Sequence, residues 1–282
     1  MSRIEEALRK VAAKNPPKTE VRTPQADETG HYTPAAQGTH AREAVPPSGT
    51  EALLDVVPLT IDNPVLATAL EKKTAIVEEY NKLRSSVIAL TKGETFQNTL
   101  LITSTASEEG KSITALNLAI SLAKEQDHTV LLVDADLRRP TLHKLLGIQP
   151  EVGLIDCLKD ELPLEKALIK TGIGKLVVLP AGKPTEDPID LLSSNRMKAI
   201  LKELKDRYPE RYVIFDTSPA HPFADARILG SLVDAILMVV REGKADKADL
   251  FKTLDDFKDR NLLGIVYNDA HQLLKKQDYY YY

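Results

Sequence analysis

The stretch that decides the fold runs from Leu100 to Ala123 and reads LLITSTASEEGKSITALNLAISLA. Its first residues form a short apolar run typical of a buried strand, and a helical pattern begins near Lys111. A polar turn containing Gly110 joins the two. The N-terminus of a helix that follows a strand in this way attracts anions, because its free N–H groups and its dipole both point at the turn. The stretch therefore predicts a phosphate-binding loop.

The end of this loop, Gly110-Lys111-Ser112, matches the end of a Walker A motif. Glycine lets backbone N–H groups curl around an oxyanion, the lysine can reach β- and γ-phosphates, and the serine hydroxyl can bind Mg²⁺. The first glycine of the strict motif is replaced by Thr105, so the prediction depends on the placement between strand and helix. The alternative is an ordinary strand–turn–helix junction with a surface lysine.

Two further apolar runs end in acids. Val130–Pro140 reads VLLVDADLRRP and contains Asp134 and Asp136, and Val213-Ile-Phe is followed by Asp216. In an extended strand, Asp134 and Asp136 would point the same way. Because carboxyl ends of parallel strands share an edge, we expect Asp134 and Asp216 to converge on the crevice that holds Lys111. Oxygen ligands of this kind suit Mg²⁺, although a lone acid here is more often a cap or turn residue.

Short Val-, Ile- and Leu-rich runs alternate with helical segments, which indicates an α/β fold with a mostly parallel sheet and helices on both faces. A single domain accounts for residues 71–270. The expected strands are Leu100–Thr103, Val130–Val133, Leu176–Leu179, Tyr212–Phe215, Ala235–Val240 and Gly264–Tyr267. The expected helices are Glu71–Thr91, Lys111–Glu125, Pro188–Arg207, Ala224–Ser231 and Lys247–Asp259.

Composition excludes several classes of protein. The 282 residues have a net charge of −4, which argues against a globally basic nucleic-acid binder. The single cysteine, Cys157, rules out a disulfide framework within the chain and is expected to be a buried hydrophobe. No apolar run is long enough to span a membrane, and the start MSRIEEALRK is not a secretory signal, so we expect a cytoplasmic protein.

The chain before the domain divides into two parts. Residues 1–15 contain an amphipathic helix candidate, Ser2–Lys14, which either docks on a partner or membrane surface, or else packs on its own domain or frays. Residues 16–50 are rich in Pro, Thr, Glu, Ala and Gln and read as a disordered linker. Residues 51–270 are then the nucleotide-binding domain, and residues 271–282 a tyrosine-rich tail.

The tail contains four of the nine tyrosines, in an unbroken run after a polar stretch. Four consecutive rings cannot all be buried on one face, so the run is either functional or a sticky, disordered terminus. The tyrosines are Tyr279, Tyr280, Tyr281 and Tyr282. Tyr80, Tyr212 and Tyr267 lie on expected helices or strands and should be less available for modification; Tyr32 and Tyr208 should be more so.

This ordered set resembles the bacterial tyrosine kinases of exopolysaccharide systems, which are P-loop relatives of the Min and Par ATPases. The resemblance covers about residues 75–282 and depends on SEEGKS, VLLVDADLRRP, VIFDTSP, LPAGKP, LLSSNRM and the terminal tyrosines. SRIEEALRK and the linker look most like the stand-alone autokinases of exosortase-associated loci.

The resemblance implies roles for individual residues. Lys111, Asp134 and Asp136 would be catalytic, with Asp134 helping a tyrosine hydroxyl to lose its proton or organising Mg²⁺ through water. The Mg²⁺ ligands would be Ser112, Asp134, Asp136 and Asp216. ATP would contact Ser107, Glu108, Glu109, Gly110, Lys111, Ser112, Ile113 and, at the adenine, Asn268, which could instead be a strand-ending turn residue. The phosphoacceptors would be the four terminal tyrosines.

The resemblance further implies an ATP- and Mg²⁺-dependent protein-tyrosine autokinase that regulates exopolysaccharide biosynthesis and export. Its partners would be a separate membrane activator of the polysaccharide co-polymerase type, other copies of the chain phosphorylated in trans, and a phosphotyrosine phosphatase. The activator would recruit it to the inner membrane.

Two positions depart from the resemblance. The family's oligomerisation motif ExxRxxR keeps Glu78 and Arg84 but has Asn81 in the middle, which puts a ring of subunits in doubt. Ala106 occupies the place of the Min/Par signature lysine. Two rivals remain: a Min/Par-like ATPase switch without kinase activity, and a nucleotide-binding adaptor for polysaccharide assembly.

Overall fold

The computed structural model describes residues 63–70, 74–207 and 210–270. The expected N-terminal helix Ser2–Lys14, the linker, Tyr32, Tyr208 and the terminal tyrosines lie outside these residues. Within the described ranges, no helix is long and apolar enough to cross a membrane.

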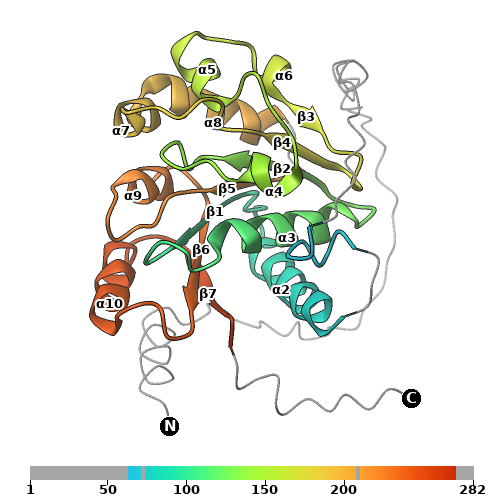
Figure 1. Cartoon of the computed structure of the whole chain (residues 1–282), viewed down its shortest axis with the longest axis vertical. Coiled ribbons are helices and arrows are strands. Elements are labelled where there is room, and N and C mark those ends of the chain that lie inside the picture. Colours follow the sequence, from blue (N-terminus) through green and yellow to red (C-terminus); the bar gives the residue numbers. More distant parts are fainter. Residues whose placement is uncertain (1–62, 71–73, 208–209, 271–282) are drawn as a thin grey trace, which may run out of the picture. The chain divides into compact units, whose positions relative to one another are not determined.

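A seven-stranded sheet forms the centre of the domain, in the order β3-β4-β2-β5-β1-β6-β7 (Figure 1). Every neighbouring pair is parallel except β3 with β4. The strands are β1 (Thr99–Ser104), β2 (Thr129–Asp134), β3 (Ile169–Lys170), β4 (Leu176–Leu179), β5 (Arg211–Asp216), β6 (Ala235–Arg241) and β7 (Leu262–Asn268). The helices are α2 (Ala75–Thr91), α3 (Lys111–Ala123), α4 (Leu142–Leu146), α5 (Leu154–Lys159), α6 (Leu164–Ala167), α7 (Pro188–Ser193), α8 (Asn195–Arg207), α9 (Asp225–Gly230) and α10 (Lys247–Asp256).

The predicted α/β class and all six predicted strands are confirmed, each within two residues at either end. The prediction of a single helix over Pro188–Arg207 is wrong. Ser194 interrupts it with an extended backbone (φ −63°, ψ 156°), and its hydroxyl accepts a hydrogen bond from the Met197 N–H. The predicted helix from Glu71 begins instead at Ala75, because the Thr74 hydroxyl caps it by accepting the Val77 N–H.

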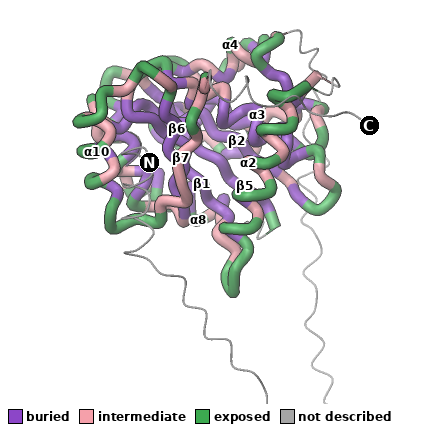
Figure 2. Tube along the Cα trace, turned by 90° about the horizontal axis from the view of Figure 1, so that it is seen from below, coloured by how far each residue is buried: buried purple, intermediate pink, exposed green. Residues whose placement is uncertain are grey.

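Both faces of the sheet are covered, which explains why its strands are apolar throughout. Leu100 and Ile102 of β1 pack in the core on the side of α3, and Leu101 packs in the core on the other side. Figure 1 shows α2 and α3 on one side of the sheet, and Figure 2 shows the strands as a buried interior between exposed helices. This alternation fixes the register, because a shift by one residue would exchange the two faces.

The parallel arrangement brings the carboxyl ends of the central strands to one edge. Asp134 of β2 lies opposite Asp216 of β5, and Ile102 of β1 pairs with the same Asp216. The loop from β1 to α3 leaves from this edge, and β7 ends there at Asn268. Such an edge is where ligands bind in open α/β sheets.

Candidate functional site

The loop between β1 and α3 has the backbone that a phosphate-binding loop needs. Gly110 adopts a left-handed conformation (φ +90°, ψ 17°) at the N-cap of α3. A Cβ at this position would also lie 2.1 Å from Nδ2 of Asn268. The left-handed conformation therefore favours glycine, and any larger residue would also displace the Asn268 amide.

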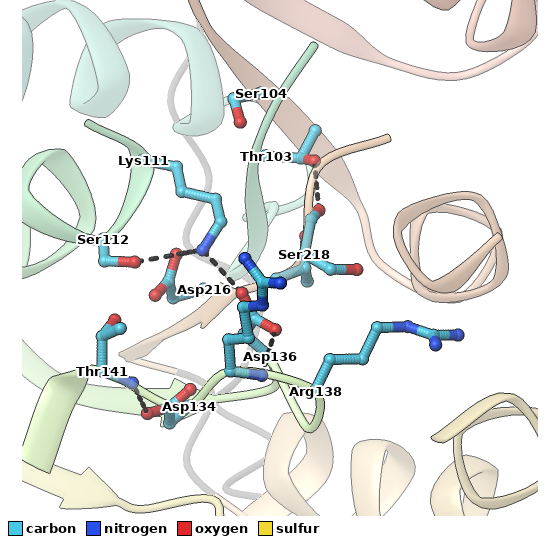
Figure 3. A network of polar contacts seen from close by, with 12 residues as sticks. Thr103, Ser104, Lys111, Ser112, Asp134, Asp136, Arg138, Thr141, Asp216 and Ser218 are labelled. Carbon is cyan, nitrogen blue, oxygen red and sulfur yellow. Dashed lines mark hydrogen bonds and ion pairs between the residues drawn. The ribbon is translucent and has the colours of Figure 1, made fainter. Parts of the chain in front are cut away.

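Lys111 points into the site and not into solvent, so the alternative of a surface lysine is wrong. Its Nζ donates to Asp136 Oδ2 at 2.8 Å, lies 3.7 Å from Asp216 Oδ1 and is 3.1 Å from the Ser112 hydroxyl (Figure 3). Burial alone would lower the pKa of Lys111, but the carboxylates of Asp216 and Asp136 outweigh it and raise the pKa above its usual value. The ammonium group therefore stays charged between two carboxylates.

Asp216 is fully buried at the end of β5. Neither of its carboxylate oxygens accepts a hydrogen bond from the described residues. Burial raises the pKa of Asp216, although the Lys111 ammonium opposes the shift. Buried oxygens without donors are costly unless a cation satisfies them, so this carboxylate suits a metal ion or an ammonium group.

Asp134 and Asp136 do not point the same way, because β2 ends at Asp134 and the chain turns before Asp136 (Figure 3). Oδ2 of Asp134 accepts the backbone N–H groups of Thr141 and Leu142, at 3.2 and 3.1 Å, at the start of α4. Burial and the nearby Asp216 carboxylate raise the pKa of Asp134 to about 8. Asp134 thus lies beside Asp216, as expected, but Lys111 meets Asp136 directly instead.

Glu109 braces the loop with a buried side chain. Its carboxylate accepts the N–H of Ala106 at 2.6 Å and that of Arg241, at the end of β6, at 3.4 Å. Asn268 donates from Nδ2 to the Glu109 carbonyl oxygen at 2.9 Å. The loop is therefore tied to the ends of β6 and β7.

The other predicted loop residues line its outer part. Ser107 and Glu108 are exposed, and Glu108 forms an ion pair with Lys244 at 2.9 Å. Ser112 and Ile113 are half-buried in the first turn of α3. The structure thus brings Lys111, Ser112, Asp136 and Asp216 together, with Asp134 behind them.

Sequence reasoning quoted Arg138 and Ser218 within VLLVDADLRRP and VIFDTSP but gave them no role, and it missed Asp225. Arg138 donates to both carboxylate oxygens of Asp225, from Nε at 2.8 Å and from Nη2 at 3.0 Å, and Ser218 donates its hydroxyl to the same carboxylate at 2.9 Å. The available signal was the two consecutive arginines after Asp136, since an arginine so near an apolar strand end needs an acidic partner.

The residues of the oligomerisation motif turn toward their own domain. Arg84 donates to the Ser121 carbonyl oxygen at 3.2 Å and pairs with Glu125 at 3.1 Å. The Ser121 hydroxyl donates to Asn81 Oδ1 at 3.4 Å. Both side chains therefore contact α3 or the turn after it, whereas Glu78 is exposed.

The described residues contain no group of three acidic, histidine or cysteine side chains arranged to hold a metal ion by themselves. Mg²⁺ is usually held by one or two carboxylates together with substrate phosphates and water. The parallel sheet, the glycine-dependent loop and the buried lysine between carboxylates together define a nucleotide-binding domain of the P-loop class.

Comparisons with known proteins narrow this class. Residues 100–276 match the CobQ/CobB/MinD/ParA nucleotide binding domain. Tyrosine-protein kinase YwqD of Bacillus subtilis (strain 168) is 36% identical over 75% of this chain and 88% of its own length. Tyrosine-protein kinase ptk of Acinetobacter johnsonii is 31% identical over 79% of this chain, which spans only 30% of that protein. The solved kinase domain of Escherichia coli tyrosine kinase ETK is 29% identical, with a TM-score of 0.66 over 79% of this chain and 88% of that one.

The chain therefore belongs to the bacterial tyrosine kinase branch of the CobQ/CobB/MinD/ParA nucleotide-binding family.

Proposed function

We propose that the chain is an ATP-dependent protein-tyrosine autokinase that phosphorylates the tyrosines of its own C-terminal tail and so regulates exopolysaccharide biosynthesis and export. The observation that carries this proposal is Lys111, buried at the N-terminus of α3 between Asp136 and Asp216. The similarity to bacterial tyrosine kinases over three quarters of the chain supports the choice of tyrosine as acceptor.

When ATP binds, phosphate oxygens replace carboxylates as the partners of the Lys111 ammonium group. The loop N–H groups and the dipole of α3 attract the phosphates, and the Lys111 ammonium turns from Asp136 to the β- and γ-phosphate oxygens. The carboxylates that it leaves then need another cation. Ser112, Asp136 and Asp216 fit Mg²⁺ in this position, with Asp134 behind them, and bound Mg²⁺ supplies charge neutralisation at the phosphates.

The transfer itself forms a bond between a tyrosine oxygen and the γ-phosphorus while the bond to ADP breaks. The phenol proton passes to a carboxylate, for which Asp134 and Asp136 are the candidates. Because the reference pKa of tyrosine is near 10, a carboxylate is a weak base for it. Positioning by the loop and charge neutralisation by Lys111 therefore supply most of the rate.

The proposal extends to partners and place. Ten residues separate Asn268 from Tyr279, a reach of at most about 35 Å, so the tail can serve its own site or that of a second copy. We propose transfer in trans within a homo-oligomer, recruitment to the inner membrane by a separate activator of the polysaccharide co-polymerase type, and reversal by a phosphotyrosine phosphatase. Since Arg84 pairs within its own chain, the oligomer depends on other contacts than the usual ion pairs of α2.

Two rivals keep the same fold. A Min/Par-like ATPase would hydrolyse ATP and leave its tyrosines unmodified, but the signature lysine of that branch is replaced by Ala106. A nucleotide-binding adaptor would bind ATP without hydrolysis or transfer.

Incubating the full chain with Mg·ATP and mapping phosphotyrosine by mass spectrometry separates the three functions. Lys111→Met should abolish labelling, because it removes the cation that binds the phosphates and leaves the fold intact. Lys198→Met, an exposed position on α8, is the matched control and should label normally. Rapid phosphate release with unmodified tyrosines would support the ATPase rival. Full labelling of Lys111→Met would contradict the mechanism.

A further inference from the structure

One fully buried carboxylate near the site has no role in binding ATP or Mg²⁺ or in the transfer step described above. Asp225 is in the first turn of α9, with none of its surface exposed. It accepts both N–H groups of the Arg138 fork, at 2.8 and 3.0 Å, and the Ser218 hydroxyl at 2.9 Å. Three donors on one carboxylate make this the most fully satisfied buried acid near the site.

These contacts join the loops after two strands, β2 and β5, to the neighbouring strand β1. Arg138 follows β2, Ser218 follows β5, and the Ser218 carbonyl oxygen accepts the hydroxyl of Thr103 in β1 at 3.0 Å (Figure 3). Arg138 points away from Lys111, toward α9, and its guanidinium lies 4.4 Å from the centre of the Phe223 ring. The side chain is therefore fixed from two sides and cannot itself reach the nucleotide.

The turn that Arg138 anchors is the one that presents Asp136. The next N–H along the chain, that of Arg139, donates to Asp136 Oδ1 at 3.0 Å, and the other oxygen of Asp136 accepts from Lys111 at 2.8 Å. An unbroken chain of contacts thus runs from α9 through the turn after β2 to the phosphate-binding lysine. A shift of the turn would move Asp136 relative to Lys111.

A second ion pair of α9 lacks this connection. Arg227 contacts Asp256 of α10 at 2.8 Å, and both side chains are partly exposed (41% and 29%). Among the described residues, neither side chain forms a hydrogen bond or ion pair with a loop at the strand ends. The two pairs therefore share a helix and the same chemistry, but only the buried pair reaches the site.

We propose that Arg138 and Asp225 are positioning residues for phosphoryl transfer, which hold the turn after β2 so that the carboxylate of Asp136 keeps its place in the site when Lys111 turns to the phosphates. This inference rests on the proposed function, because it names residues that serve the same site. It assigns them an effect on the rate of transfer and not on nucleotide affinity, since neither touches the loop that binds the phosphates.

The test uses the full chain and compares Arg138→Lys with wild type and with Arg227→Ala. Lysine keeps the charge but cannot donate in a fork, so the turn loosens while the buried carboxylate stays paired. We expect kcat for self-labelling to fall about tenfold or more, since small displacements of reacting groups are costly. KM for ATP, the dissociation constant of ADP and the melting temperature should stay close to wild type. Arg227→Ala should leave kcat unchanged.

A double-mutant cycle tests whether the pair acts as a unit. Arg138→Ala and Asp225→Ala should each lower kcat, and the double variant should be no slower than the slower single variant. The proposal would be overturned if the fold-loss of kcat in the double variant equalled the product of the two single fold-losses. It would also be overturned if Arg138→Lys kept the kcat of wild type, or if its loss of kcat/KM came entirely from a higher KM. ATP hydrolysis is measured in parallel: if the wild-type chain labels no tyrosine, the proposed function fails, and the hydrolysis rate still decides whether the pair positions Asp136.

Discussion

Cys157 illustrates at the residue scale how burial controls chemistry. It lies on α5 with none of its surface exposed, and burial raises the pKa of its thiol to about 11. Because the thiolate is the nucleophile, a thiol reagent should react slowly with the folded chain at pH 8 and rapidly once urea unfolds it. The rate for the folded chain should rise as the pH approaches 11. Fast labelling of the folded chain at pH 8 would contradict this prediction.

Asp134→Asn should separate binding from transfer. Asparagine keeps the size of the side chain, and its amide oxygen can still accept the N–H groups of Thr141 and Leu142, so the start of α4 should stay intact. We expect ADP affinity near wild type and self-labelling reduced by about 100-fold, the low end for loss of a general base. Asp160→Asn, an exposed change on α5's C-terminal side, is the control. Undiminished labelling of Asp134→Asn would make this carboxylate purely structural.

The sequence predicts which residues form the site better than it predicts how their side chains are oriented. Asp134 and Asp216 lie side by side as expected, because the ends of paired parallel strands converge, but Lys111 contacts Asp136 and Asp216 and does not contact Asp134 directly. Asp134 and Asp136 are oriented differently because of a turn after β2, and no hydrophobic periodicity in the sequence predicts that turn. Tyr267 was expected to be shielded by its strand, but its side chain is 48% exposed, because β7 is an edge strand with no neighbour among the described strands on one side.

Ser194 governs the boundary between two elements, α7 and α8. Its hydroxyl accepts the Met197 N–H at 3.1 Å and donates to the Leu191 carbonyl oxygen at 2.7 Å, so it satisfies one helix end on each side. Ser194→Ala should lower the free energy of unfolding by about 1 kcal/mol, the usual cost of losing an N-cap. Urea titration measures the change. Ser193→Ala, one residue earlier and exposed, should change it by less than about 0.5 kcal/mol.

The same boundary shows where element prediction fails. Leu191, Leu192, Met197 and Ile200 keep enough apolar spacing to suggest one continuous helix, and nothing in composition marks the extended residue between them. The helices α4, α5 and α6 and the strand β3 were not predicted; with four and two residues, α6 and β3 are too short to show a period. The six longer strands were found because burial on both faces makes each an unbroken apolar run.

At the scale of the whole molecule, the sheet order explains why the tail starts near the site. β7 lies beside β6, is separated from β5 by β6 and β1, and ends at the edge that carries Lys111. Arg241 of β6 donates to Asp269 at 2.7 Å and to the Glu108 carbonyl oxygen at 3.4 Å, so the first residue after β7 is linked to the phosphate loop. The chain therefore leaves the domain next to the position that ATP would occupy.

Deleting Tyr279–Tyr282 should remove most self-labelling without affecting nucleotide binding. The contacts described above for the loop, Lys111 and the sheet are all made between residues 63 and 270, so we expect ADP affinity and the urea midpoint to match wild type. The amount of phosphotyrosine should fall to a small fraction of the wild-type amount, because Tyr212 is fully buried and Tyr80 is half-buried. Quantitative phosphotyrosine mapping on the full and shortened chains measures the difference.

Tyr267 is the control that this deletion needs, because it is exposed and lies one residue before Asn268. Its backbone is held in the sheet beside Val240, so it cannot extend into a neighbouring site as a tail can. Tyr267→Phe in the full chain should therefore label almost as heavily as wild type. If instead the shortened chain labels like the full chain and Tyr267→Phe removes the signal, the edge of β7 is the acceptor and the terminal tyrosines are not.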